Sequence, residues 1–261
     1  MILLLDIGNT HTHLGLADAG GVRRQGQVAT RGWRDGRAEA AVRRFAGRAR
    51  VEGAAVCSVV PWATPRAERV LRRVWRVAPY RLTAASLVGL GVRYPRPETI
   101  GPDRLANAVA ARLLYGAPSV VIDFGTAVTF DVVDRRGDYV GGIIAPGLAV
   151  MTDYLHEKTA LLPRIRIREE KGVIGRNTEQ AMRIGAVHGY RGLIRELLGR
   201  LRRELGARRL RVVATGGYAR LMAAGLPEIA EVRPALTLEG LHLAWRQACA
   251  GAAGRPGPAA K

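Results

Sequence analysis

Cysteine, lysine and long apolar runs are all scarce in this chain of 261 residues. Its two cysteines, Cys57 and Cys249, lie far apart and lack the spacing of a metal site, which predicts reduced thiols in a cytoplasmic protein. No run approaches the roughly 20 apolar residues that cross a bilayer. The apolar opening is also too short for a signal peptide. We therefore expect no membrane partner and no disulfide framework.

Aromatic residues are few as well, at 5%, and the four tryptophans are too dispersed to form a stacking platform for nucleic acid. The formal net charge of +19 would nevertheless attract polyanions. Only Lys158, Lys171 and Lys261 are lysines, and the arginines are scattered along the chain rather than gathered in one arm. This distribution predicts no specific nucleic-acid partner.

The chain also lacks a Gly-x-x-x-x-Gly-Lys-Ser/Thr loop, which excludes a Walker-type phosphate site. It has an internal repeat instead, in which residues 3–10 resemble residues 120–127. Each copy is an apolar run, an aspartate, an apolar residue, glycine and a hydroxyl residue, followed by a second β-like run. Both copies predict a hairpin with a glycine turn. The repeat predicts an α/β fold of two duplicated lobes with a cleft between them.

Apolar periodicity predicts the elements between and after the hairpins. Helices are expected at residues 38–50, 64–77, 105–115, 178–205 and 236–250, and a strand at 210–214 enters a glycine turn. Glycines 185, 189 and 192 fall near one helix face and are expected to admit a neighbouring backbone. The predicted division is an N-terminal lobe of residues 1–116, a C-terminal lobe of residues 117–250 and a disordered tail of residues 251–261.

The hairpin tips have the residue types that a phosphate site needs. A glycine turn exposes backbone N–H groups that form an anion-binding concavity. A carboxylate beside phosphate is repulsive unless a cation intervenes, so Asp6 is expected to hold Mg²⁺ through water. One such turn alone would be an ordinary hairpin, and the second copy at Asp123 favours the functional interpretation. His11 and His13 could bind a metal, but no third ligand is near.

The segment Gly101-Pro102-Asp103-Arg104 is the best candidate for binding a hydroxyl acceptor. Proline just inside a helix start and glycine before it are typical of a helix N-terminus. Asp103 would then lie in the first turn, where the helix dipole favours its ionised form. An ionised carboxylate there can align a hydroxyl group, although aspartate is also a routine capping residue.

Six segments together resemble the type III pantothenate kinases, which belong to the actin-like ATPase and sugar kinase superfamily. They match in the family's order and spacing across residues 1–248: residues 6–10, 101–104, 123–131, 141–147, 177–182 and 236–241. The resemblance implies a duplicated actin-like ATPase fold, also called ribonuclease H-like. It further implies transfer of a phosphoryl group from ATP to pantothenate at the start of coenzyme A biosynthesis, by a homodimer.

The resemblance also assigns roles to individual residues. Asp103 is the catalytic base, and Asp123 holds a monovalent cation, K⁺ or NH₄⁺. The acceptor contacts are Tyr94, Gly101, Pro102, Asp103, Arg104 and Thr178. The ATP contacts are Asp6, Ile7, Gly8, Asn9, Thr10, His11, Thr12, His13 and Thr126. Pro102 departs from the family's usual alanine and removes a backbone donor.

Two other functions are consistent with parts of the sequence. Another small-molecule kinase of the superfamily would keep the hairpins but lack the combination of Tyr94, Asp103, Arg104 and Thr178. A non-enzymatic transcriptional regulator would fit the positive charge but should have lost a carboxylate. Asp6, Asp103 and Asp123 are all present.

Overall fold

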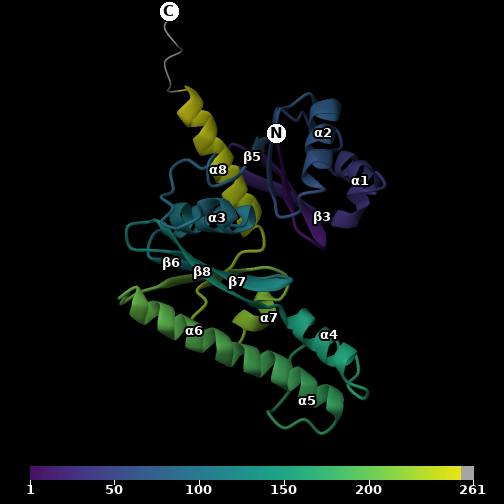
Figure 1. The fold of residues 1–261 in the computed structure, drawn as a ribbon, viewed down its shortest axis with the longest axis vertical. Helices are drawn as coiled ribbons and strands as arrows, with labels where there is room; N and C mark the ends of the chain where they lie inside the picture. The colour runs from purple at the N-terminus through teal and green to yellow at the C-terminus, as the bar shows by residue number, and fades with distance from the viewer. Residues whose placement is uncertain (254–261) are drawn as a thin grey trace, which may run out of the picture. The chain divides into compact units, whose positions relative to one another are not determined.

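The computed structural model describes residues 1–253 of the chain, which form two compact units. The first unit comprises residues 1–114 together with the chain from Ala235 onward, and the second comprises Tyr115–Pro234. Figure 1 shows the elements of both along the chain. Those of the first unit are β1 (Ile2–Ile7), β2 (His11–Asp18), β3 (Gly21–Ala29), η1 (Thr30–Trp33), α1 (Arg37–Ala46), β4 (Gly53–Ser58), α2 (Thr64–Trp75), β5 (Tyr80–Arg81), η2 (Pro97–Thr99), α3 (Pro102–Ala110), η3 (Ala111–Tyr115) and α8 (Leu236–Ala253).

The first sheet has the strand order β3-β2-β1-β4-β5. Strands β1, β2 and β3 form an antiparallel meander, whereas β4 and β5 run parallel to β1 after helical crossovers. The meander follows from the short turn after Ile7, because antiparallel neighbours need only a tight connection while parallel neighbours need a crossover. The central strand β1 is almost wholly apolar until it reaches Asp6.

Successive side chains of the central strand point to opposite faces of the first sheet, and each face is covered by helices. Leu3, Leu5 and Ile7 pack in one core cluster with helices α1 and α2, which lie side by side in Figure 1 and are joined by an ion pair between Glu39 and Arg73. Leu4 faces the other way, where its neighbour Gly15 approaches Leu238 of α8. Because successive side chains alternate, Asp6 lies on the same face as Leu4.

The second unit is built round its own five-stranded sheet. Its elements are β6 (Ser119–Phe124), β7 (Ala127–Val133), β8 (Tyr139–Pro146), α4 (Leu148–Lys158), α5 (Thr178–Ile184), η4 (Gly185–Gly189), α6 (Tyr190–Glu204), β9 (Arg211–Thr215), α7 (Ala219–Ala223) and β10 (Glu231–Val232). The core of this unit joins Ile122 and Phe124 of β6 to Ile194 and Leu198 of the long helix α6. The opposite-facing position between them is Asp123.

The two sheets repeat one topology. The second sheet has the order β10-β9-β6-β7-β8. Read from its β5 edge, the first sheet has the order β5-β4-β1-β2-β3, so each strand has a counterpart at the same place in the second. In both units the central strand pairs antiparallel with the next strand and parallel with the fourth. The predicted duplication and the α/β class are therefore confirmed, and the repeated hairpins are the first two strands of each sheet.

The largest difference from the predicted division concerns the last helix. Helix α8 belongs to the first unit, where Gly240 packs so closely on α3 that a Cβ atom would lie 1.9 Å from the Ala106 carbonyl oxygen. Sequence order alone had placed it in the second lobe. Helix α8 also continues to Ala253, so residues 251–253 of the predicted tail are helical. Residues 254–261 lie outside the described part of the chain.

The glycines on the helix face at 185–192 were predicted to admit a neighbouring backbone, and this prediction is wrong. Gly185, Gly189 and Gly192 have no described atom within 4 Å of where a Cβ would stand, apart from their own helix and chain neighbours. The helix instead packs on its sheet through larger residues, Tyr190, Ile194 and Leu198. Residues 185–189 form a single π-helical turn that joins α5 to α6.

Candidate active site

The first hairpin presents Asp6 where β1 ends. Asp6 pairs with His13 across the antiparallel ladder and with Cys57 across the parallel one. Directly opposite residues share a face of the sheet, so His13 and Cys57 lie on the side of Asp6. His11 and His13 are exposed, and Gly8 closes the turn by donating its N–H to the His11 carbonyl at 3.0 Å. Asn9 and Thr10 at the tip are exposed as well.

Buried hydroxyl groups on the core face support this hairpin through hydrogen bonds. The Trp33 indole donates to Thr12 Oγ1 at 3.0 Å, Thr12 and Thr30 share a 3.1 Å hydrogen bond, and the Thr30 hydroxyl donates to the Gly8 carbonyl at 2.7 Å. The chain of donors thus ends on the glycine of the turn. Ile7 and Thr12, both predicted to contact ATP, are fully buried on the core face. Only their backbone atoms could contact a ligand on the Asp6 side.

Asp103 and Asp6 both act on the buried thiol of Cys57. The Cys57 thiol is fully buried and donates to Asp6 Oδ1 at 3.4 Å. Burial raises the pKa of Cys57 well above its ordinary value, and the negative charges of Asp6 and Asp103 raise it further. The thiol therefore stays protonated and remains a donor to Asp6. The structure thus brings together two residues that stand 97 positions apart in the sequence.

Helix α3 starts at Pro102, as predicted, with Asp103 in its first turn. Asp103 Oδ1 accepts a hydrogen bond from the Arg104 N–H at 2.9 Å. The carboxylate folds back so closely that a Cβ on Gly101 would lie 2.5 Å from Oδ1. A larger residue at position 101 would push this carboxylate out of its present position.

The pKa of Asp103 is raised, whereas the helix dipole was expected to favour the ionised form and so to lower it. Burial raises it above the ordinary value, and hydrogen bonding and charge from Arg104 offset this only in part. Desolvation of a carboxylate outweighs the field of one short helix because the ionised form loses water that a single N–H does not replace. A raised pKa makes Asp103 a stronger base than a solvated aspartate.

The second hairpin holds Asp123 in the matching position. Asp123 pairs with Thr129 and with Thr215, so the end of β9 lies next to it. Gly216 follows with a φ of +90°, and a Cβ there would stand 2.5 Å from Asp123 Oδ1. The glycine loop after β9 is thus packed directly on this carboxylate. Its bare backbone leaves the oxygen a space that any other residue would fill.

The turn of the second hairpin is exposed at Thr126 and is supported by the strand that follows. The Gly147 N–H donates to the Thr126 carbonyl at 3.0 Å, and a Cβ on Gly147 would come as close as 2.2 Å to that oxygen. Gly147 also precedes the first residue of helix α4. The segment at 141–147 that carries part of the family resemblance therefore fixes the tip of this hairpin.

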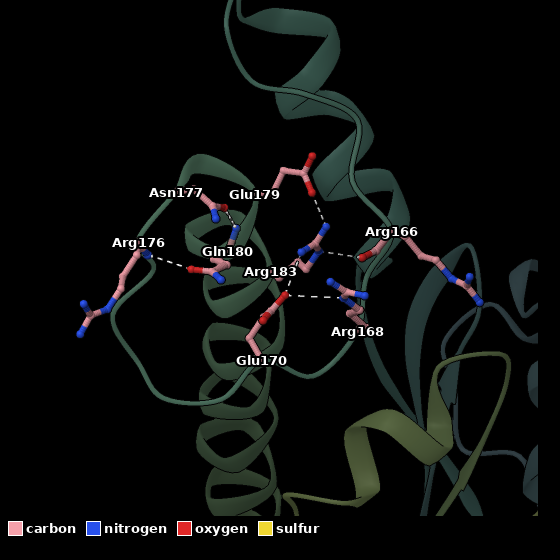
Figure 2. Close-up of polar contacts among 8 residues, drawn as sticks. All are labelled: Arg166, Arg168, Glu170, Arg176, Asn177, Glu179, Gln180 and Arg183. Atoms are coloured by element: carbon pink, nitrogen blue, oxygen red, sulfur yellow. Dashed lines mark hydrogen bonds and ion pairs between the residues drawn. The ribbon is translucent and has the colours of Figure 1, made fainter.

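The remaining acceptor candidates belong to different units. Tyr94 is partly exposed in the connection before α3 in the first unit. Thr178 is the first residue of α5 in the second unit and lines a cavity of about 500 Å³ with Arg168 and Arg183. Figure 2 shows the polar contacts round this turn, where Asn177 accepts a hydrogen bond from the Gln180 N–H at 2.9 Å.

A larger cavity of about 950 Å³ adjoins the glycine loop of the second unit. Gly217 and Tyr218 line it, together with Ile165, Ile167 and Leu221. Four arginines line it as well, Arg164, Arg166, Arg168 and Arg220. Asp153 and Glu169 line the cavity too, so its lining combines apolar side chains with charges of both signs and an excess of arginine.

Sequence reasoning missed the residues that support the site rather than line it. Cys57, Thr30 and Trp33 have no motif of their own, and only the strand register and the tertiary hydrogen bonds reveal them. No group of three or more histidine, cysteine, aspartate or glutamate side chains that could hold a metal occurs within residues 1–253. None of the helices described is long and apolar enough to cross a membrane.

The duplicated sheets with their aspartate hairpins define the actin-like ATPase class of folds. A putative Baf family transcriptional activator from Campylobacter jejuni superposes with a TM-score of 0.61 at 16% identity, over 97% of this chain and 100% of that one. A putative 2-dehydro-3-deoxygalactonokinase from Sinorhizobium meliloti does so with a TM-score of 0.54 at 14% identity, over 100% and 98%. At such identities the likeness concerns the fold alone.

The sequence comparisons identify the family within this class. The profile of the type III pantothenate kinases matches residues 2–200. A type III pantothenate kinase from Methylacidiphilum infernorum is 45% identical over 244 residues, which are 93% of this chain and 87% of that protein. One from Akkermansia muciniphila is 54% identical over 196 residues, 75% of this chain and 78% of that protein. The chain belongs to the type III pantothenate kinase family.

Proposed function

We propose that this protein transfers the γ-phosphoryl group of ATP to the primary hydroxyl of pantothenate, with Asp103 as the catalytic base. Family membership supports the reaction, and the partly buried Asp103 carboxylate with its raised pKa is the observation that supports the role. Phosphoryl transfer passes through a loose transition state and depends mainly on positioning and charge neutralisation. Asp103 would align the acceptor hydroxyl and accept its proton late in the transfer.

The two hairpins are proposed to bind the phosphates of ATP. Backbone N–H groups of glycine turns are suited to phosphate oxygens, and the tip residues Asn9, Thr10 and Thr126 are exposed. The side chains of His11 and His13 lie on the Asp6 face and can take part, whereas Ile7 and Thr12 would contribute backbone only. The cavity beside Gly217 and Tyr218 is the proposed place of the adenine ring.

Two cations are proposed to accompany ATP. Asp6 is a single carboxylate at a strand end, which suits Mg²⁺ held through water, because this ion keeps several waters in protein sites. Asp123 suits a monovalent ion, since its carboxylate lies near the end of β6 against the backbone of Gly216. The ions would neutralise phosphate charge during transfer. The protein residues would orient the ions and the substrates.

Pantothenate is proposed to contact Tyr94, the segment 101–104 and Thr178. Arg104 offers a guanidinium group that can pair with a carboxylate, and pantothenate carries one. The exposed hydroxyl of Thr178 can donate to the same ligand. Pro102 fits this arrangement as the first residue of α3, where its missing N–H would have no helical partner.

A homodimer in the cytoplasm is proposed as the working form. The second unit exposes many large apolar side chains: Ile144, Val150, Tyr154, Leu155, Leu161, Val173 and Ile174. Exposed apolar patches of this kind often mark protein interfaces. Light scattering should give twice the chain mass, and Leu161→Glu should halve it while Val88→Ser in the first unit does not. A monomeric wild-type protein would exclude the dimer.

A coupled ATP-consumption assay tests the reaction. Purified protein receives MgATP with pantothenate, or with a panel of sugars, sugar acids and other hydroxy acids. ADP release that depends on pantothenate, with phosphopantothenate identified by mass spectrometry, supports the proposal. A preference for any other acceptor, or ATP consumption indifferent to pantothenate, would reject it.

A further inference from the structure

Two neighbouring glutamates in the connection between α4 and α5 hold two buried arginines of the following helices. Glu170 accepts a hydrogen bond from Arg183 Nη1 at 2.8 Å, and Glu169 accepts two from Arg191 at 2.8 and 2.6 Å. The arginine side chains are only 10% and 7% exposed. Charge-assisted pairs of this kind are strong and directional. The connecting segment is therefore joined to two different places in the second unit.

The Arg183 pair fixes the start of helix α5. Besides Glu170, Arg183 contacts Glu179 in the first turn of that helix, and its Nε donates to the Arg166 carbonyl at 3.1 Å (Figure 2). Glu179 directly follows Thr178. The guanidinium thus ties the turn that carries Thr178 to the segment at 166–170.

Other contacts of the same turn leave Thr178 available for a ligand. Gln180 Oε1 accepts the Arg176 N–H at 3.0 Å while Asn177 caps Gln180, so the backbone before the helix is held reciprocally. Gly175 packs so tightly that a Cβ would lie 2.4 Å from the Ala181 nitrogen. Across the described residues the Thr178 hydroxyl makes no hydrogen bond. The turn is rigid, and one exposed hydroxyl remains for an acceptor.

The Arg191 pair holds the far end of helix α7. Arg191 Nη2 donates to the Leu221 carbonyl at 2.7 Å, near the helix C-terminus, where a cation is favoured by the dipole. Gly225 makes room for the guanidinium, since a Cβ there would stand 2.5 Å from it. Helix α7 begins at Ala219, with one residue between it and the glycine loop at 216–217. Its position therefore sets the loop that packs on Asp123.

We propose that Arg183 and Arg191 are positioning residues with separate tasks. Arg183 fixes the turn that offers Thr178 to pantothenate, and Arg191 fixes the glycine loop that receives the nucleotide. This assignment rests on the proposed function. The simpler alternative is that both arginines only stabilise the fold, because both are buried and both hold glutamates of the same segment.

Paired substitutions separate these two explanations. Lysine keeps the charge but lacks the planar guanidinium group with its several donors. Arg183→Lys should therefore weaken the contacts to Glu170, and Arg191→Lys should weaken those to Glu169. Arg183→Lys should raise KM for pantothenate roughly tenfold and leave KM for MgATP unchanged, and Arg191→Lys should do the reverse. Arg200→Lys is the control, because Arg200 forms an exposed ion pair with Glu196 one turn apart on the same helix. It should change neither constant.

The outcomes are distinguishable from a general loss of stability. Melting temperatures of all variants are measured alongside the kinetics, and Glu170→Gln and Glu169→Gln replace the lysine variants if those fail to fold. Lower melting temperatures with both KM values unchanged, or the same shift of both constants in both variants, would overturn the proposal. If the wild-type protein ignores pantothenate, the proposed function and the Arg183 assignment fall together. The Arg191 assignment is then decided by MgATP titration calorimetry, in which Arg191→Lys must weaken binding and Arg183→Lys must not.

Discussion

The catalytic role proposed for Asp103 would come at the expense of stability. Its carboxylate is desolvated, its pKa is raised, and its principal hydrogen bond comes from the N–H of the next residue. A group under these conditions gains little from ionisation in the folded state. A strongly desolvated carboxylate with a perturbed pKa is typical of functional sites, which agrees with the proposed role.

Asp103→Asn should therefore lower turnover by roughly 10²–10⁴, the usual scale for loss of a general base. The amide keeps the shape but cannot accept the proton of the acceptor hydroxyl. Binding of MgATP should be unchanged, since the residue serves the acceptor. Steady-state kinetics and nucleotide titration measure the two effects. Turnover that is retained while ATP affinity falls tenfold would contradict the assignment.

The same substitution should change how stability depends on pH. A carboxylate whose pKa is raised on folding contributes stability that is full below its unfolded pKa of about 3.9 and is lost as pH rises through the folded value. The asparagine variant has no such loss. Its melting temperature relative to wild type should rise from acidic to neutral pH, as followed by calorimetry. A constant difference across that range would contradict the raised pKa.

At the scale of elements, the hairpins could be predicted because their pattern is local. An apolar run, an aspartate and a glycine turn occupy eight consecutive residues in each copy, and strand pairing follows from adjacency. The supporting groups could not be predicted, because Thr30 and Cys57 reach Gly8 and Asp6 only through tertiary contacts. The buried positions of Ile7 and Thr12 follow from alternation once the register is known.

Removing the buried support should loosen the first hairpin. Thr30→Val is nearly isosteric but leaves the Gly8 carbonyl and the Thr12 hydroxyl without their partner, at a cost of about 1–3 kcal/mol. KM for MgATP should rise and KM for pantothenate should not. Thr237→Val is the matched control, since Thr237 donates to Asn107 at 2.9 Å elsewhere in the same unit. Equal effects of the two variants on KM would show that stability alone is involved.

The cation site proposed at Asp123 leads to a separate prediction, that the reaction rate depends on which monovalent cation is present. In the proposed function, the triphosphate bound with Asp6 and Asp123 carries more negative charge than one Mg²⁺ balances, and the lysine of a Walker loop is absent. A K⁺-sized ion on Asp123 should therefore be needed. Rates in Na⁺, K⁺ and NH₄⁺ at equal ionic strength should differ, and Asp123→Ala should abolish the difference. Equal rates in all three salts would mean that nearby arginines supply the charge instead.

At the scale of the whole molecule, the duplication could be predicted from sequence but the membership of each unit could not. The repeated motif indicates two sheets, and both have the same strand order. Helix α8 joins the first unit because Gly240 allows it to pack on α3, a contact between residues more than 130 positions apart. Nothing in the local pattern of α8 specifies that partner.

The net charge of +19 belongs to the molecule as a whole and predicts only non-specific binding to nucleic acid. Many of the arginines already pair with acidic neighbours, as Arg23 does with Asp18 and Arg37 with Asp35. Unpaired guanidinium groups scattered over a surface can contact phosphates but cannot read bases. Binding to duplex DNA should therefore weaken steeply and linearly in log–log coordinates as salt rises, with no dependence on sequence. Fluorescence anisotropy with two unrelated duplexes across a salt series measures both properties. A footprint on one sequence that survives physiological salt would instead revive a regulatory role for this fold.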